Sequence, residues 1–219
     1  QDFKLSLALS TSATDSAQPK DTITIMDSSC CEETAKRILK IYQTSLDTAI
    51  NTFNFNAISK TAELILTSQS IHFFGFGGSG TSANEAKNKF LKILPNIIYN
   101  SDSHIQLMQA ALLGKNDLAI IFSNSGVTKD CIKISKICHT NGAKVVFATM
   151  FAKTPATAYC DVLLPCGAKE GPMEGGSISN KLSQLLLIDI LYAEVYRQLG
   201  ERALENKKKT SQVITDKMM

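Results

Sequence analysis

Hydroxyl side chains gather in two short segments of this 219-residue chain, and each segment ends a run of apolar residues. The first, Phe74 to Ser82, reads F-G-F-G-G-S-G-T-S, and the second, Phe122 to Thr128, reads F-S-N-S-G-V-T. Serine and threonine hydroxyls donate neutral hydrogen bonds to phosphate oxygens. If the fold brings the two segments together, they form a cradle for an anion.

The elements predicted around these segments favour the same chemistry. Ile71–Phe74 and Leu118–Phe122 are short apolar runs typical of buried strands, and helical periodicity follows each turn. A strand–turn–helix join directs backbone N–H groups and the positive end of the helix dipole at one point, which suits a phosphate. Serine and threonine are also common helix caps, but one cap explains one hydroxyl. Three hydroxyls within six residues favour phosphate binding: Ser123, Ser125 and Thr128.

Three ionisable residues are further candidates. His104 follows the second predicted strand, where a neutral imidazole can bond a sugar hydroxyl or amide, or else faces water. Lys181 is either a surface lysine or a cation that reaches the phosphate, from its own or a neighbouring subunit. Glu174 lies in a glycine-rich loop and would be the base of an isomerase, or else an exposed acid. The predicted ligand-binding set is Gly78, Ser79, His104, Ser123, Asn124, Ser125, Thr128 and Lys181, with no catalytic residue.

A dinucleotide site is the alternative for the first turn. Gly75, Gly77 and Gly80 match the G-x-G-x-x-G fingerprint, and Asp102 follows at roughly the distance of a ribose-binding acid. A dinucleotide domain, however, has no need of a second serine-rich turn after its third strand. We therefore expect no cofactor.

Strand and helix patterns alternate from Ser70 onward, which indicates a parallel sheet covered on both faces. We predict an α/β three-layer sandwich with a five-stranded parallel flavodoxin-like sheet, preceded by a helical hairpin. In that strand order the first and third strands are neighbours, so both turns fall at the switch point. The expected strands are Ile71–Phe74, Asn96–Tyr99, Leu118–Phe122, Lys144–Ala148 and Asp161–Leu164. The expected helices are Thr34–Phe53, Ile58–Leu66, Thr81–Ile93, His104–Leu113 after a capping box at Ser103–Gln106, Thr128–Thr140 and Ser177–Leu199.

Composition excludes several classes of protein and site. The net charge of +3 is too small to argue for nucleic acid or a membrane surface by itself. Only three of the 23 basic residues are arginines, so hydroxyls, backbone amides and lysine are the expected phosphate ligands. The six cysteines form no C-x-x-C pair or zinc pattern, which predicts reduced thiols, no metal and a cytoplasmic protein. No signal peptide or membrane-length apolar run is evident.

The organisation along the chain suggests a piece of a longer protein. Residues 1–9 look like the last turns of a helix whose partners are missing, and residues 10–28 have the composition of a linker. Residues 29–219 would form the sheet domain. Its helices Thr34–Phe53 and Leu182–Leu199 offer apolar surface for a homodimer.

From about Ser29 to the C-terminus the chain resembles the sugar isomerase (SIS) domain, a phosphosugar-binding module. The most specific match is S-x-S-G-x-T at Ser123–Thr128. The resemblance implies that Ser79, Ser123, Ser125 and Thr128 hold the phosphate of a sugar phosphate. Isomerases and lyases also use this fold, so a phosphosugar isomerase or lyase is the rival interpretation.

A narrower resemblance is to RpiR-type transcription regulators, and it rests on four segments: Gln1–Leu5, Asp102–Gln106, Asn180–Leu191 and Glu201–Leu204. Where many relatives have Ser-Arg, this chain has Asn180-Lys181. The resemblance implies the effector-binding domain of a bacterial repressor, with operator DNA bound through a missing N-terminal helix-turn-helix domain. The expected effector is a phosphorylated amino sugar such as N-acetylmannosamine 6-phosphate, and the expected targets are sialic-acid catabolism genes.

Overall fold

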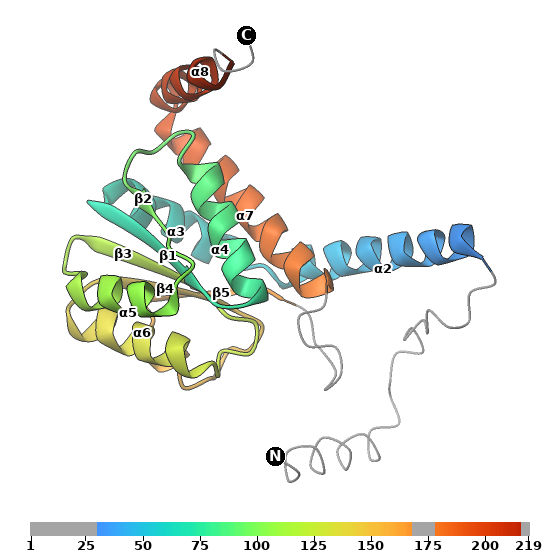
Figure 1. The fold of residues 1–219 in the computed structure, drawn as a ribbon, viewed down its shortest axis with the longest axis horizontal. Helices are drawn as coiled ribbons and strands as arrows, with labels where there is room; N and C mark the ends of the chain where they lie inside the picture. Colours follow the sequence, from blue (N-terminus) through green and yellow to red (C-terminus); the bar gives the residue numbers. More distant parts are fainter. Residues whose placement is uncertain (1–29, 168–177, 216–219) are drawn as a thin grey trace.

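Five parallel strands form one sheet in the computed structural model, which describes residues 30–167 and 178–215 (Figure 1). Their order across the sheet is β2-β1-β3-β4-β5, which confirms the predicted flavodoxin-like topology. The expected helix remnant at 1–9, the linker at 10–28 and Glu174 lie outside the described residues. The strands are β1 (Ser70–Gly75), β2 (Ile97–Ile98), β3 (Asp117–Phe122), β4 (Lys144–Thr149) and β5 (Val162–Pro165).

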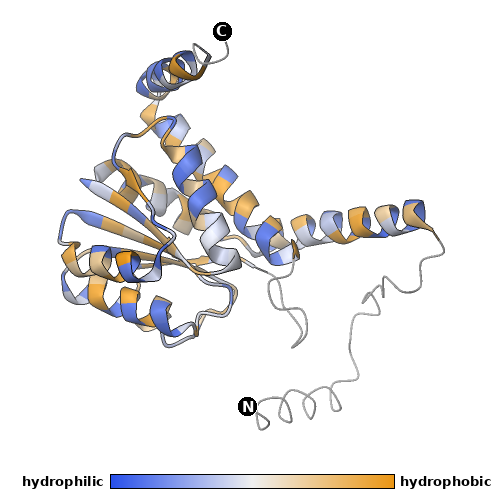
Figure 2. Cartoon of the chain, in the orientation of Figure 1, coloured by the Kyte–Doolittle hydropathy of each residue, from blue (hydrophilic) through white to orange (hydrophobic). Residues whose placement is uncertain are grey.

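Helices cover both faces of the sheet and complete the three layers. Helices α3 (Phe55–Thr67), α4 (Gly78–Phe90) and α7 (Ile178–Leu199) share one apolar core with the sheet, whereas α5 (Ser103–Leu112) and α6 (Lys129–Thr140) share the other. Helix α8 (Glu201–Thr215) follows α7 after a break at Gly200. In Figure 2 the helices carry both hydrophobic and hydrophilic stretches, as expected where one face is buried.

The central strands are apolar throughout because both of their faces are covered. Residues 71–75 of β1 and 118–122 of β3 are all buried. Alternate residues enter opposite cores, so Phe73 contributes to the core under α4 and α7, and Phe74 to the core under α5 and α6. The two central strands are therefore anchored in both cores.

Two helices precede the sheet, as predicted. Helix α2 (Cys31–Thr52) extends away from the sheet, and it and α3 both pack against α7 rather than folding back on one another as a closed hairpin (Figure 1). The Asn54 side chain caps α3 by accepting a hydrogen bond from the Ala57 N–H at 3.1 Å. Cys30 stands at the N-cap of α2 and makes no capping bond with its side chain.

Helices α2, α3 and α4 each begin three residues before the predicted start, and α5 begins with a different cap from the one predicted. Helix α4 begins at Gly78 rather than Thr81, because Gly77 adopts a positive φ of 55° and serves as the N-cap. Helix α5 has no capping box: Asp102 is the N-cap and accepts bonds from the N–H groups of His104 and Ile105. Gln106, expected to reach back to the cap, points inward and is fully buried.

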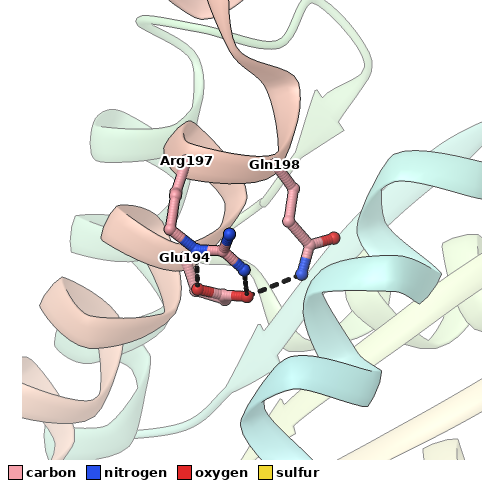
Figure 3. A network of polar contacts seen from close by, with 3 residues as sticks. All are labelled: Glu194, Arg197 and Gln198. Carbon is pink, nitrogen blue, oxygen red and sulfur yellow. Dashed lines mark hydrogen bonds and ion pairs between the residues drawn. The ribbon is translucent and has the colours of Figure 1, made fainter.

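Helix α7 connects most of the helical layer, since it contacts α2, α3, α4 and α8. Near its C-terminal end Glu194 accepts hydrogen bonds from Arg197 and Gln198 (Figure 3). The Arg197 bonds, followed by that of Gln198, lower the pKa of the Glu194 carboxyl to about 2. Across residues 30–167 and 178–215, no helix combines the length and the apolar character that a bilayer crossing demands.

Candidate functional site

The two hydroxyl-rich turns lie side by side at the carboxyl edge of the sheet. Strands β1 and β3 are hydrogen-bonded neighbours, and their register pairs Gly75 with Phe122, the last residue of each strand. The chain therefore enters α4 and α6 from adjacent points, at the switch point predicted from the strand order. A cavity of about 190 Å³ lies between the turns, lined by Phe76, Gly78, Ser79, Phe122, Ser123, Asn124, Ser125, Thr128, Cys131 and Asn180.

Glycine shapes the first turn for steric reasons. A Cβ atom at Gly75 would lie 2.6 Å from the backbone oxygen of Ser79, so only glycine lets α4 start so close to β1. The buried Gln106 side chain fixes the same residue from the other layer. Its Oε1 accepts from the Gly75 N–H and its Nε2 donates to the Gly75 carbonyl, both at 3.1 Å. Gln106 therefore anchors the start of the turn that carries Ser79.

The second turn is held by bonds to the strand beside it. Ser123 N–H donates to the Ala148 carbonyl at 3.0 Å, and Thr149 Oγ1 donates to the Asn124 carbonyl at 2.9 Å. The chain reverses at Gly126, whose φ is +64° and whose N–H donates to Ser123 Oγ at 3.3 Å. Ser123 is 3% exposed, so its hydroxyl lies at the base of the cavity.

Thr128 and Ser125 present exposed hydroxyls at the start of α6. Thr128 is the N-cap residue, yet its side chain makes no capping hydrogen bond. Ser125 Oγ accepts a long bond of 3.4 Å from the Val127 N–H, which leaves the Ser125 proton available. Helix capping therefore does not explain the Thr128 hydroxyl. The first N–H groups of α4 and α6 also have no acceptor within their own helices.

The base of the cavity is neutral. Cys131, in the first turn of α6, is 1% exposed. Burial is the main cause that raises the pKa of its thiol to about 12. A hydrogen bond with Ser123 lowers this pKa, and the nearby Asp130 carboxylate raises it. Among the described residues, those lining the cavity include no acidic side chain. The arrangement suits a dianion held by hydroxyls and helix N-termini.

Helix α7 forms a third side of the site. Asn180 lines the cavity and is 6% exposed. The Cε atom of Lys181 lies 3.2 Å from the position of a Cβ on Gly78, so the Lys181 side chain covers the first turn of α4 within the same chain. One turn further along, Gln184 Nε2 donates a hydrogen bond to Ser79 Oγ at 3.3 Å.

Six of the eight residues proposed from sequence line the cavity: Gly78, Ser79, Ser123, Asn124, Ser125 and Thr128. Lys181 lies at the rim of the cavity. His104 is exposed in the first turn of α5 and is not among the described residues that line the cavity. Sequence reasoning did not assign Asn180, Gln184 and Cys131 to the site. Asn180 and Gln184 share a helix face with spacing i, i+4, which is the signal that could have found them.

Both sequence features that favoured a dinucleotide site have another explanation in the structure. The three fingerprint glycines are explained by the close approach of β1 and α4 and by the positive φ of Gly77. Asp102, the proposed ribose-binding acid, uses its carboxylate to cap α5. The described residues also contain no group of three or more His, Cys, Asp or Glu side chains placed to hold a metal ion.

Comparison with known proteins places this geometry in a family. The family model described as the SIS domain matches residues 64–194. An HTH-type transcriptional regulator of Haemophilus influenzae is 31% identical over 98% of this chain and 75% of its own length. The HTH-type transcriptional regulator RpiR of Escherichia coli is 28% identical over 74% of this chain and 54% of its own length. The chain belongs to the RpiR-type regulators with a SIS domain.

A solved structure extends the likeness to the fold of this SIS domain. The Vibrio vulnificus NanR protein complexed with ManNAc-6P superposes with a TM-score of 0.84 and 21% sequence identity. The match covers all of this chain and 76% of that protein. At this identity the likeness concerns the fold.

Proposed function

We propose that this chain is the effector-binding domain of a transcription regulator and that its effector is a phosphorylated sugar. The observation that carries the proposal is the cavity of about 190 Å³ between two helix N-termini. It is lined by the hydroxyls of Ser79, Ser123, Ser125 and Thr128, with the cationic Lys181 beside it. Neutral donors and helix dipoles stabilise a phosphate dianion and have less to offer an uncharged sugar.

The amino sugar phosphate N-acetylmannosamine 6-phosphate is the effector that we propose. Support comes from the fold shared with the Vibrio vulnificus NanR protein, which was solved in complex with ManNAc-6P. Asn180 lines the cavity and its amide group can both donate and accept hydrogen bonds, as recognition of a sugar hydroxyl or an acetamido group requires. Genes of sialic-acid or amino-sugar catabolism are the proposed targets of regulation.

A thermal-shift screen tests the proposal. At a ligand concentration about 100-fold above Kd, linkage stabilises the folded state by about 2.7 kcal/mol. For a domain of this size, that corresponds to a rise in Tm of roughly 5–10 °C. N-acetylmannosamine 6-phosphate should produce this rise, whereas N-acetylmannosamine should not. Equal shifts with the two compounds would contradict recognition through the phosphate.

We also propose that the regulator is a homodimer that binds operator DNA in the cytoplasm. Apolar side chains are exposed on the two helices named from sequence for this contact, Leu39 and Ile50 on α2 and Leu185 on α7. A second copy would remove them from water. Light scattering on the purified chain should give twice the monomer mass, and Leu39→Glu on α2 should reduce it.

The rival activity, a phosphosugar isomerase or lyase, needs an acid–base pair at the sugar. Glu174, the proposed base, lies outside the described residues, and His104 is exposed and apart from the described cavity lining. We propose that no turnover occurs. NMR spectra of sugar 6-phosphates incubated with the protein should stay unchanged, whereas turnover that disappears in Glu174→Gln would establish an enzyme.

A further inference from the structure

The hydrogen bond between α7 and the first turn of α4 has a direction that matters for an anion. Gln184 Nε2 is the donor, and Ser79 Oγ is the acceptor, at 3.3 Å. A serine hydroxyl carries a single proton. When a lone pair of Ser79 Oγ already accepts from Gln184, the proton of Ser79 remains to be donated elsewhere. Ser79 lines the cavity, so a bound anion is the acceptor within reach.

The surroundings of Gln184 make this bond a persistent one. Its side chain is fully buried, on the part of α7 that packs against the apolar core shared with α4. Its Oε1 has no hydrogen-bond partner among the described residues, so the Nε2 bond to Ser79 is the polar contact that orients the amide. The Gln184 side of the bond is shielded from water, so solvent does not replace the donor.

We propose that Gln184 is a positioning residue for anion binding: it holds Ser79 as a hydrogen-bond donor toward the phosphate. The inference rests on the proposed function, because it specifies how one hydroxyl of that phosphate site is set. It also makes α7 part of the site through a group that does not touch the ligand. Asn180, one turn earlier on α7, lines the cavity directly, and Lys181 lies over Gly78 at its rim.

Gln184→Glu tests the direction of the bond with almost no change of shape. A carboxylate can only accept, so Ser79 would turn its proton toward residue 184 and away from the anion. A protonated carboxyl can donate again, and burial raises the pKa of a carboxyl group. We therefore expect binding to be weakened at least about tenfold at pH 8 and restored to within about threefold of the unmodified protein by pH 5.

The other charged groups nearby do not mimic this pH profile. Lys181 lies over Gly78, and Lys89 of α4 pairs with Asp189 of α7 further along the two helices. These groups are present in every protein compared, so a ratio of affinities taken at one pH removes their contribution. Each variant is compared with the unmodified protein at the same pH, which removes the titration of the ligand phosphate. Gln212→Glu, on the exposed face of α8, is the control for an added carboxylate. Its Kd should equal that of the unmodified protein at each pH.

Two further variants separate positioning from simple charge repulsion. Repulsion by a carboxylate at 184 would persist in a Ser79→Ala background, whereas loss of positioning cannot. We expect the pH 8 penalty of Gln184→Glu to shrink severalfold in that background, and a penalty of unchanged size would overturn the proposal. Gln184→Met donates nothing and should weaken binding about two- to tenfold at every pH. Unchanged affinity in Gln184→Met would equally overturn it.

The two ligands distinguish this inference from the proposed function. Isothermal titration uses N-acetylmannosamine 6-phosphate and, separately, inorganic sulfate, a tetrahedral dianion that does not titrate in this range. If sulfate shows the expected profile and the sugar phosphate does not bind, the effector proposal fails and the role of Gln184 stands. If both bind and Gln184→Met keeps the affinity of the unmodified protein, only the role of Gln184 fails. If neither binds, both fail.

Discussion

Thr128→Ala separates ligand binding from helix capping, because Thr128 stands at the N-cap of α6 without a capping bond from its side chain. A capping hydroxyl is worth about 1 kcal/mol, which for a domain of this size is roughly 2–4 °C in Tm. Since Thr128 makes no such bond, the substitution should lower the Tm of the unliganded protein by less than about 1 °C.

The same substitution should reduce affinity for the phosphosugar. A hydrogen bond to a charged group contributes about 1.5–3 kcal/mol, and the exposure of Thr128 to competing water favours the lower end. We expect Kd for N-acetylmannosamine 6-phosphate to rise roughly tenfold. Ser123 is buried, so Ser123→Ala should approach the upper end, with some loss of Tm because its hydroxyl accepts from Gly126 N–H.

Asn54→Ala is the matched control, because Asn54 caps α3 with a real bond to Ala57 N–H and does not line the cavity. It should lower Tm by roughly 2–4 °C and leave Kd unchanged. Differential scanning calorimetry and titration calorimetry on the two variants give the complete comparison. A Thr128→Ala protein that loses Tm like Asn54→Ala and keeps its affinity would refute the phosphate role of Thr128.

Three other predictions follow from burial and from the domain proposal. Burial lowers the pKa of His72, and the opposing attraction of Asp117 is the smaller effect. The unfolded state therefore binds more protons, so the stability of the folded protein should fall as pH drops below about 6.5. In His72→Phe the drop in Tm between pH 7.5 and pH 5.5 should be smaller. Alkylation at pH 8, followed by mass spectrometry, should modify the exposed Cys30 and Cys31 quickly. Three thiols are buried and have a pKa raised to about 12, and they should react only after denaturation: Cys131, Cys138 and Cys166. Anisotropy titration should show an operator affinity of the full-length regulator that changes severalfold with the phosphosugar, whereas this chain alone should bind no operator specifically; a full-length protein insensitive to saturating ligand would remove the effector role.

The sequence predicted the sheet well because its signals are local. Short apolar runs at 71–74 and 118–122 are typical of buried strands in a doubly covered sheet, and the structure places strands there with the expected order. Helix α6 likewise ends at Thr140, as predicted, and Gly142 follows with a φ of +83°. Such features depend on neighbouring residues alone.

Contacts between distant residues explain what could not be predicted. Gln106 fits a capping box by spacing, but tertiary structure uses its amide to hold Gly75, 31 residues away. The Gln184–Ser79 bond joins residues 105 apart, and no local pattern announces it. The start of α4 was placed three residues late, because glycines that usually break a helix here form its first turn.

The cradle is built on the two central strands of the sheet, where many contacts hold the backbone. Its two turns begin at Gly75 and Phe122, paired residues of the two central strands, and Gln106 and Thr149 fix the turns from either side. A phosphate entering a preorganised site orders little backbone, so little conformational entropy opposes binding. The same rigidity makes the cradle a poor source of movement. We expect a regulatory signal from this domain to begin in side chains at the rim, on α7, because α7 also packs against α2 and α3.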